Sequence, residues 1–298
     1  MRAIVFGGSG FLGSHVADAL QARGFDVRIF DLRPSPYLRP GQEMLVGDIL
    51  DEESVGRAID GCQYVYNFAG VADIEDANRR PLDTARLNVL GTTILLNAAV
   101  AARVERFLYA STVYVYSQAG GFYRCSKQAA ELYIEMYQEV HGLPYTILRY
   151  GSLYGPRADA NNAVRRYLTE ALLQGRVVCY GDGEEVREYV HVEDAARTSV
   201  EILSPEFTNE HVVLTGHQPM KVRALLETIQ EILNRKIDIV FEPPDTTVHY
   251  RITPYNFHPK IGKKLVGRYY LDMGQGLLAC LNEIHREAEL APAWQPKP

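Results

Sequence analysis

The sequence lacks the features that would commit it to a nucleic acid, a metal or an oxidising compartment. Its 298 residues include only four cysteines and one tryptophan, and the formal net charge is −6. The cysteines lie far apart, without CxxC spacing or nearby histidines, which favours reduced thiols over disulfides or a zinc site. His249 and His258 show no metal spacing either. Nucleic-acid binders usually carry a basic excess, which this acidic chain does not have.

The chain also has no long hydrophobic run and no leader-like N-terminus. Its longest apolar stretch, around residues 93–102, is about half the length that a membrane span needs. The opening MRAIVFGG reaches glycine too soon for a signal peptide. With 47% hydrophobic and 23% charged residues, the composition is that of a soluble globular protein. These observations predict a cytoplasmic protein with no membrane partner.

Strand-like and helix-like patterns alternate through the first half of the chain. Short apolar runs predict strands at residues 3–6, 27–30, 43–46, 64–68, 106–110 and 145–149. Helical periodicity occurs at residues 12–23, 54–59, 82–103 and 126–141. The alternation predicts an α/β fold, a doubly wound parallel sheet of the Rossmann type with both faces covered. Beyond residue 151 the pattern turns irregular, with helices at 163–173 and 222–233, and predicts a smaller α/β domain.

The first predicted strand runs into GGSGFLG at residues 7–13, a GxxGxxG loop that opens a helix. Gly7 permits a tight turn, Gly10 lets the backbone approach a pyrophosphate, and Gly13 allows close packing of the helix on the strand. Asp31 ends the second strand 18 residues after Gly13, where a carboxylate can accept both ribose hydroxyls and repel a 2′-phosphate. This pattern predicts a dinucleotide site that prefers NAD, although the nearby Arg33 leaves NADP open. An ordinary glycine turn is the alternative.

The stretch GFYRCSKQAAE places Tyr123 one helical turn before Lys127. A chain with 19 tyrosines and seven lysines is expected to contain fewer than one such pair by chance. The pair is therefore weak evidence by itself, and its surroundings decide its meaning.

Several segments in a fixed order resemble a known family. They are GGSGFLG at 7–13, Asp31, GDI at 47–49, NFAG at 67–70, NVLGT at 88–92, AST at 110–112, the Tyr123–Lys127 pair, LRYGSLYGP at 148–156 and REYVHVEDAA at 187–196. With these segments the chain resembles the extended short-chain dehydrogenases/reductases, in particular the nucleotide-sugar epimerase/dehydratase group. The resemblance covers nearly the whole chain.

The resemblance implies an NAD site along the carboxyl ends of the strands. Its residues would be Gly7, Gly10, Phe11, Leu12, Gly13, Asp31, Asp48, Ile49, Phe68, Ala69, Gly70, Tyr123, Lys127 and Tyr150. Asp48 and Ile49 would contact the adenine, and Asn88 would support the wall of the active site. Tyr150 matches a residue beside the nicotinamide, although an aromatic residue after a strand can also be simple packing.

The resemblance also implies a catalytic trio of Thr112, Tyr123 and Lys127. A free tyrosine titrates near pH 10, so it is a poor base at neutral pH. A lysine ammonium one turn away and a positive nicotinamide ring both favour the phenolate. Tyr123 would take a proton from a sugar hydroxyl, Thr112 would hydrogen-bond the same oxygen, and Lys127 would also hold the nicotinamide ribose.

Two differences from the family's sequence pattern reduce the number of reactions that this chain is expected to catalyse. The dehydratases of the group carry Asp-Glu after the catalytic threonine, and the decarboxylases carry a Glu two residues after it, whereas this chain has Val113 and Tyr114. Neither side chain can replace a carboxylate, which leaves epimerisation or ketone reduction. Only ten residues separate Thr112 from Tyr123, so the loop that usually shapes the sugar pocket is cut to a short, glycine-containing connection that we expect to be flexible.

Three residues of the second half match substrate-binding positions of the family. Arg187 would contact the nucleotide diphosphate, because an arginine fork binds phosphate oxygens bidentately. A surface ion pair with Glu184 or Glu193 is the alternative. Arg251 is a second phosphate candidate in an altered motif, and Ser152 stands where many epimerases have Asn, which shortens that sugar contact.

The sequence therefore predicts an NAD-dependent nucleotide-sugar epimerase, most simply at C4, working through a keto-sugar intermediate. A reductase of nucleotide keto-sugars would use the same trio, and a cofactor-binding regulator without turnover is a third reading. The predicted domains are an NAD-binding domain at 1–156, rejoined by about 186–205, a substrate domain at 157–290 and a tail at 291–298. An amphipathic helix at 274–285 would close the chain.

A homodimer is also predicted, through the helices at 82–103 and 126–141. Both carry apolar residues on more than one face: Leu87, Leu90, Ile94 and Leu95 in the first, and Leu132, Ile134, Met136 and Tyr137 in the second. Related proteins pair these helices with those of a partner. The alternative is that both helices only cover the sheet.

Overall fold

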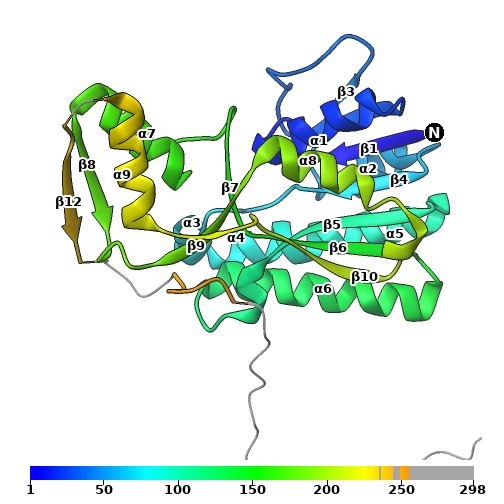
Figure 1. Cartoon of the computed structure of the whole chain (residues 1–298). Helices are drawn as coiled ribbons and strands as arrows, with labels where there is room; N and C mark the ends of the chain where they lie inside the picture. The colour runs from blue at the N-terminus through cyan, green and yellow to red at the C-terminus, as the bar shows by residue number, and fades with distance from the viewer. Residues whose placement is uncertain (235, 244–248, 255–298) are drawn as a thin grey trace, which may run out of the picture. The chain divides into compact units, whose positions relative to one another are not determined.

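Seven parallel strands form the central sheet of the protein, seen here in a computed structural model (Figure 1). The structure describes residues 1–234, 236–243 and 249–254. The strand order is β10 (Glu210–Leu214), β6 (Tyr145–Tyr150), β5 (Arg106–Thr112), β4 (Tyr64–Asn67), β1 (Arg2–Phe6), β2 (Asp26–Asp31) and β3 (Glu43–Val46). The order reverses between β1 and β4, the place where open α/β sheets form ligand sites. The predicted doubly wound sheet is confirmed.

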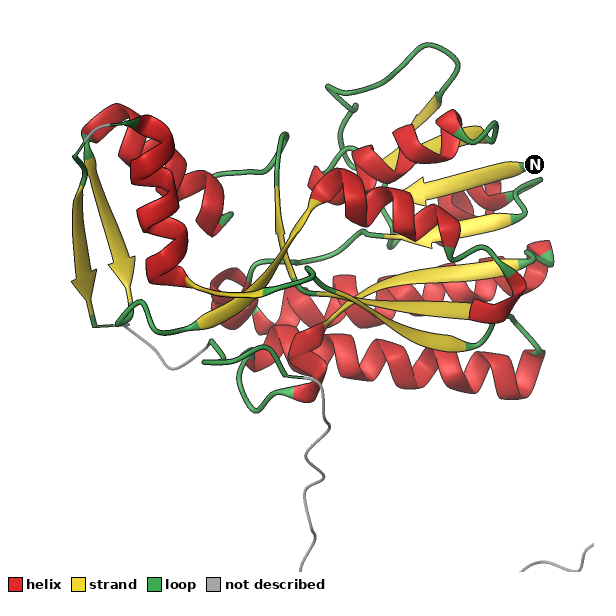
Figure 2. Ribbon diagram, viewed as in Figure 1, coloured by secondary structure: helices red, strands yellow, loops and turns green. Residues whose placement is uncertain are grey.

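The strands β1 to β6 supply apolar side chains to both faces of the sheet, as buried parallel strands must. In β1, Ala3 and Val5 pack toward α1 (Phe11–Ala22) and α8 (Val192–Glu201), while Ile4 and Phe6 point to the opposite core. That second core is closed by α2 (Glu52–Ile59), α5 (Thr92–Ala102) and α6 (Gly121–His141). Figure 2 shows these helices as layers on the two sides of the strands.

The second half of the chain divides between this sheet and a smaller group of elements. β10 pairs with β6, and α8 packs against α1, so both belong to the main sheet and its helices. The short 3₁₀ turn η3 (Pro205–Phe207) also packs on the main sheet. The remaining elements are β7 (Ser152–Tyr154), α7 (Ala163–Gln174), β8 (Arg176–Tyr180), β9 (Val186–His191), β11 (Pro219–Lys221), α9 (Val222–Leu233) and β12 (Asp238–Glu242). A separate apolar core lies between α7, α9 and the β8–β12 pair.

The helices that carry the site differ in detail from the sequence expectation. α6 begins at Gly121 rather than at residue 126, so Tyr123 lies inside it. The helix expected at 82–103 is composed of α4 (Pro81–Ala85), a π-helical turn η1 (Arg86–Gly91) and α5. A short helix α3 (Ile74–Arg79) and a 3₁₀ turn η2 (Val113–Tyr116) were not expected. Each of these two elements follows a side chain that caps its first turn. Asp73 accepts a hydrogen bond from the Asp76 N–H, and Thr112 accepts one from the Tyr114 N–H.

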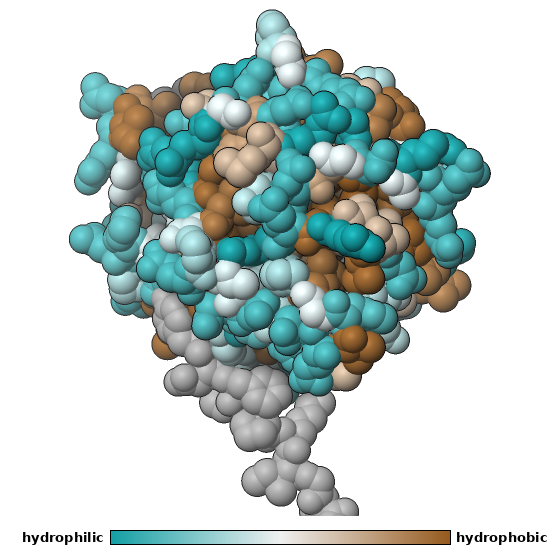
Figure 3. Space-filling view, turned by 90° about the vertical axis from the view of Figure 1, so that its right-hand side faces the viewer, coloured by the Kyte–Doolittle hydropathy of each residue, from teal (hydrophilic) through white to brown (hydrophobic). Residues whose placement is uncertain are grey.

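One helix, Pro81–Ala102, is long and apolar enough by length and composition to cross a membrane, which the shorter apolar run in the sequence did not indicate. Core helices of water-soluble proteins pass the same test, and Leu95 and Leu96 of this helix are fully buried against the sheet. The face shown in Figure 3 is mainly hydrophilic, with apolar residues in separate patches.

Several sequence predictions lie outside the described residues. These are the closing helix at 274–285, the tail at 291–298 and His258, and one of the four cysteines, Cys280, lies outside them too. The other three cysteines are free thiols. Met1–His258 forms one compact unit, and the domain boundary at residue 156 stays a prediction.

The two-sided core predicts a strong difference between buried and exposed leucines. Leu95→Ala in α5 empties a fully buried site and is expected to lower the free energy of unfolding by about 2–5 kcal/mol. Leu173→Ala, at a side chain that is 75% exposed in α7, should change it by less than about 0.5 kcal/mol. Urea unfolding followed by circular dichroism measures both, and equal effects would contradict this packing.

Candidate active site

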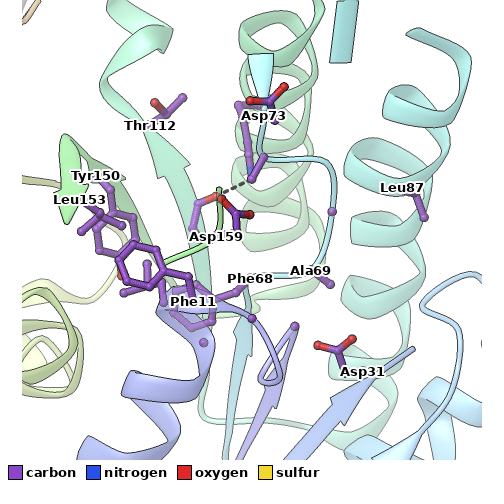
Figure 4. A pocket seen from close by; sticks show the side chains of 18 of the residues that line it. Phe11, Asp31, Phe68, Ala69, Asp73, Leu87, Thr112, Tyr150, Leu153 and Asp159 are labelled. Carbon is purple, nitrogen blue, oxygen red and sulfur yellow. Dashed lines mark hydrogen bonds between the residues drawn. The ribbon is translucent and has the colours of Figure 1, made fainter. Parts of the chain in front are cut away.

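A cavity of about 570 Å³ lies at the carboxyl ends of the strands (Figure 4). Segments that follow six strands of the main sheet line it, from β1 through β6. They contribute Gly7, Gly10, Phe11, Leu12, Gly13, Asp31, Ile49, Phe68, Ala69, Gly70, Thr112, Tyr123, Lys127 and Tyr150. In Figure 4, Phe11, Tyr150 and Leu153 stand on one side of the cavity, and Ala69 and Leu87 on the other. The structure thus gathers nearly all of the predicted cofactor and catalytic residues in one place.

The glycine loop is built so that backbone alone faces the cavity. Gly7 has a φ of +76°, and its carbonyl accepts the Gly10 N–H at 3.1 Å. A Cβ on Gly13 would lie 2.3 Å from the Gly7 carbonyl oxygen, so only glycine fits there. The N-cap of α1 is Gly10, which offers no side chain to the first-turn N–H groups. These groups can therefore receive a diphosphate, and the dinucleotide predicted from the sequence fits the loop.

Asp31 is held at the wall of the same cavity by the loop. Its Oδ2 accepts the Ser9 N–H at 3.0 Å, and the Ser9 hydroxyl donates to the Arg33 carbonyl at 2.9 Å. The carboxylate lines the cavity, whereas Arg33 does not, and its side chain is exposed. A carboxylate in this place suits an unphosphorylated ribose and so favours NAD over NADP.

The three predicted catalytic residues come from two elements. Thr112 ends β5, while Tyr123 and Lys127 lie in the first two turns of α6. Burial raises the pKa of Tyr123 to about 12, contrary to the lowering expected from Lys127, and a hydrogen bond from Thr112 opposes that rise. Burial lowers the pKa of Lys127 to about 8, and Glu131 opposes that fall. The Lys127 Nζ donates to the Ala110 carbonyl at 2.7 Å and lies 5.8 Å from the centre of the Tyr123 ring.

Asn88 ties the wall of the cavity to the base of the catalytic helix. It lies in the π-helical turn η1, and π turns frequently mark functional sites. Its Oδ1 accepts the Val71 N–H at 2.7 Å, and its Nδ2 donates to the Val71 carbonyl and to the Ser126 hydroxyl. The Ser126 hydroxyl in turn donates to the Tyr123 carbonyl at 2.8 Å. Asn88 thus occupies the supporting position expected of it.

Two of the predicted residues lie beside the cavity without lining it. Asp48 sits between the lining residues Gly47 and Ile49, and its carboxylate accepts the Leu50 N–H at 2.9 Å. Ser152 begins β7, next to the lining residue Gly151. Their roles toward adenine and sugar stay predictions.

The two arginines predicted for the diphosphate also lie outside the cavity wall. The Arg187 guanidinium packs 4.4 Å from the centre of the Tyr250 ring and donates to the Val186 carbonyl. Among the described residues it forms no ion pair, so the surface pairing with Glu184 or Glu193 is not observed. Arg251 is 71% exposed and pairs with Asp182 at 3.4 Å. Arg187 thus has no carboxylate partner among the described residues, whereas Arg251 has Asp182, and the contacts of both with a phosphate stay predictions.

Sequence reasoning missed several polar residues that line the cavity: Asp73, Asp159, Asn161 and Asn162. Asp73 is the N-cap of α3 and Asn162 the N-cap of α7. Their sequence signal was therefore one of helix capping, with nothing to indicate that the caps face a ligand site. In the described part of the chain, no group of three or more His, Cys, Asp or Glu side chains could hold a metal ion.

The short connection after Thr112 is held by hydrogen bonds at both of its ends, and its flexibility stays a prediction. The Asn78 side chain accepts the Phe122 N–H at 3.0 Å, and Arg124 donates to the Ser117 carbonyl at 2.9 Å. Gly120, with a φ of +95°, leaves room for Tyr114, since a Cβ there would lie 2.8 Å from its ring.

Tyr114 itself forms part of an aromatic wall beside the catalytic tyrosine. Its hydroxyl lies 2.7 Å from His249 Nδ1. Its ring centre lies 4.6 Å from that of Tyr250 and 6.3 Å from that of Tyr123.

Comparison with known proteins agrees with this geometry. The model of the NAD-dependent epimerase/dehydratase family matches residues 3–214. A putative UDP-glucose 4-epimerase of Methanocaldococcus jannaschii is 26% identical over 270 residues, covering 84% of this chain and 88% of that protein. The UDP-glucose 4-epimerase of Thermotoga maritima, solved with UDP-glucose, is 29% identical and superimposes with a TM-score of 0.80 over 86% of this chain and 90% of its own. The corresponding Thermus thermophilus enzyme, solved with NAD, is 26% identical, with a TM-score of 0.78 over 88% and 95%.

The glycine loop predicts a matched pair of variants. Gly13→Ala places a methyl group 2.3 Å from the Gly7 carbonyl oxygen and is expected to weaken NAD binding by more than about tenfold, because the phosphate-binding turn must shift. Gly56→Ala, in helix α2 with no atom within 4 Å of the new Cβ, should bind NAD like the wild type. Isothermal titration calorimetry compares the two. Unchanged NAD affinity in a folded Gly13→Ala protein would remove the loop from the site.

Proposed function

Since the chain belongs to the NAD-dependent epimerase/dehydratase family and is an NAD-dependent enzyme, we propose that it is a nucleotide-sugar epimerase that inverts C4. The family includes epimerases and dehydratases, so the reaction must be argued from the residues around Tyr123.

The observation that carries the proposal is the identity of the residues after Thr112. Water elimination needs a second acid and base beside the catalytic tyrosine, and Val113 cannot act as either. Tyr114 carries no carboxylate, and its hydroxyl already lies 2.7 Å from His249 Nδ1. Two other carboxylates of the cavity, Asp73 and Asp159, each accept a backbone N–H. Neither follows Thr112 in the chain as the carboxylates of the dehydratases and decarboxylases do, so we propose a single acid–base residue, as epimerisation requires.

The catalytic residues divide the work on one sugar hydroxyl. Tyr123 removes the proton of the 4-hydroxyl, and Thr112, hydrogen-bonded to Tyr123, orients the same oxygen. The Lys127 ammonium favours the phenolate that accepts this proton. NAD, when bound, supplies the hydride acceptor and donor at the sugar carbon. The keto sugar then presents its other face, and Tyr123 returns the proton.

The proposed substrate is a nucleoside diphosphate sugar, with UDP-glucose as the first probe because similar enzymes were solved with it. Arg187 supports this choice as a half-buried cation without an ion-pair partner among the described residues. We assign it to the diphosphate, with Arg251 as a second contact after release from Asp182 and Ser152 as a short sugar contact. A cytoplasmic location belongs to the same proposal.

We also propose a homodimer formed through α6 and the helix Pro81–Ala102. Ile94, Leu95 and Ile134, which the sequence offered as interface candidates, are buried in the core and cover the sheet instead. Other apolar side chains on these helices are 48–72% exposed: Leu82, Leu90, Leu132, Tyr133, Met136 and Val140. Leu132, Met136 and Val140 recur every four residues along α6 with Tyr133 next to the first of them, and Tyr137 joins this helix to Asn97 of α5 at 2.6 Å. Two adjacent helices thus present one apolar face.

The first prediction concerns turnover. Nuclear magnetic resonance of the protein with NAD and a panel of nucleotide sugars, without added reductant, should show a C4-inverted sugar formed in excess over the enzyme. If the nucleotide sugars are converted only when reduced cofactor is supplied, the protein is a keto-sugar reductase and the epimerase proposal is wrong.

A matched pair of tyrosine variants tests the role of Tyr123. Tyr123→Phe should lower kcat by about 10²–10⁴, because the proton acceptor is lost, while NAD binding persists. Tyr180→Phe removes a hydroxyl from an exposed tyrosine of β8 and should leave kcat unchanged. Retention of most of the turnover by Tyr123→Phe would remove this residue from its role.

The dimer predicts a change of mass in solution. Leu132→Glu combined with Met136→Glu places two charges on the apolar face of α6 and is expected to give a monomer, whereas the wild type gives a dimer by light scattering. Leu172→Glu, at an exposed leucine of α7, is the control and should remain dimeric. A monomeric wild type would end the proposal.

A further inference from the structure

The catalytic trio depends on how a helix is seated on a strand. Thr112 belongs to β5, whereas Tyr123 and Lys127 belong to α6. The hydrogen bond from Lys127 to the Ala110 carbonyl joins the two elements at one point. One contact does not prevent rotation or sliding of a 21-residue helix, so a second contact is needed to hold the three side chains together.

Glu131 supplies that second contact one turn beyond Lys127. It is 5% exposed, and its Oε1 accepts the Ser111 hydroxyl at 2.5 Å. Ser111 lies between Ala110, whose carbonyl accepts the Lys127 hydrogen bond, and the catalytic Thr112. The two successive contacts therefore fix both the position and the rotation of α6 over the end of β5.

Arg149 holds the Glu131 carboxylate from the neighbouring strand. Its Nε and one terminal nitrogen donate to the two carboxylate oxygens at 3.1 and 2.6 Å. Arg149 lies on β6 directly beside Ser111 in the register of the sheet. Its other terminal nitrogen donates to the hydroxyl of Tyr116, in the turn after Thr112, at 2.5 Å. The network joins α6, β5, β6 and the turn η2 around the catalytic residues.

The network also places charge near the catalytic lysine. The titratable groups that face Lys127 are Tyr123 and Glu131 from α6 and Tyr109 from β5, whose ring centre is 4.8 Å from Nζ. Arg149 of β6 binds the Glu131 carboxylate. Burial lowers the pKa of Lys127, and Glu131 is the group that opposes this. Without the carboxylate, the buried Lys127 would lose this opposing charge and Arg149 would lose its partner.

We propose that Glu131 is a positioning residue for the catalytic trio: held by Ser111 and Arg149, it fixes α6 on β5 and supplies the negative charge that keeps Lys127 protonated. Its effect on turnover rests on the proposed function, whereas its effect on the charge of Lys127 does not. Glu131 touches neither the cavity nor the reacting atoms, because it is not among the residues that line the cavity.

The test that needs no substrate is the titration of Lys127. The chain has seven lysines, so selective ¹³C labelling at lysine Cε gives few signals, and Lys127→Arg identifies the one of interest. We expect Lys127 to titrate near pH 8 in the wild type. Glu131→Gln should lower its midpoint by about one pH unit, because the opposing charge is removed. Glu139→Gln, at an exposed glutamate of the same helix, is the control and should leave it unchanged. An unchanged midpoint in Glu131→Gln would overturn the charge assignment.

Turnover tests the positioning half of the proposal. In Glu131→Gln the alkaline limb of the kcat–pH profile, where kcat declines, should move to lower pH together with the titration midpoint of Lys127. At pH 8, kcat should therefore fall about fivefold, while KM stays within about twofold. Ser111→Ala is a smaller change that keeps the carboxylate. It should lower kcat without moving the limb, and full kcat in this variant would overturn the contact with β5. If the titration shifts as expected and no nucleotide sugar is converted, the proposed function fails and the charge assignment stands.

Discussion

The buried ammonium of Lys127 is the constraint from which the geometry of the site follows. A charge taken out of water costs several kcal/mol unless it is paired and hydrogen-bonded, at about the level of the whole stability of a domain. Lys127 meets that demand with the Ala110 carbonyl and with the field of Glu131. Sliding of α6 along β5 would separate the Lys127 ammonium from the Ala110 carbonyl. The hydrogen bond that offsets the cost of burying the ammonium therefore also holds Tyr123 beside Thr112.

The rest of the fold brings the cofactor residues to that point. In a parallel sheet, the carboxyl ends of all strands meet at one edge, and the reversal of strand order between β1 and β4 separates the crossing helices there. The glycine loop after β1 and the trio after β5 therefore face one cavity, although more than 100 residues separate them. The fold brings these segments to one cavity, and close packing, such as that of Gly13 on Gly7, fixes the positions of their atoms there.

Local patterns in the sequence predicted what depends on local physics. The alternation of apolar strands with helices led to the sheet, and the glycine spacing led to the phosphate-binding turn. The same patterns did not predict contacts between residues that are far apart in the sequence. Tyr114 contacts His249, 135 residues later, and Arg149 binds Glu131, 18 residues before it. The π-helical turn that aims Asn88 at Val71 and Ser126 also escaped, because an extra residue in a helical turn leaves the apolar periodicity nearly unchanged. Apolar stripes on α6 were recognised, but only packing separated Ile134, which covers the sheet, from Met136, which faces outward.

The most direct test of the central claim follows one hydrogen atom. A nucleotide sugar that the protein converts is prepared with deuterium at C4 and incubated with the protein and catalytic NAD, and the product is examined by nuclear magnetic resonance. The account predicts that C4 is inverted and keeps its deuterium, with no net gain of reduced cofactor, because the same atom leaves and returns within one site. Inversion with loss of deuterium to the solvent, or net oxidation of the sugar without inversion, would contradict it.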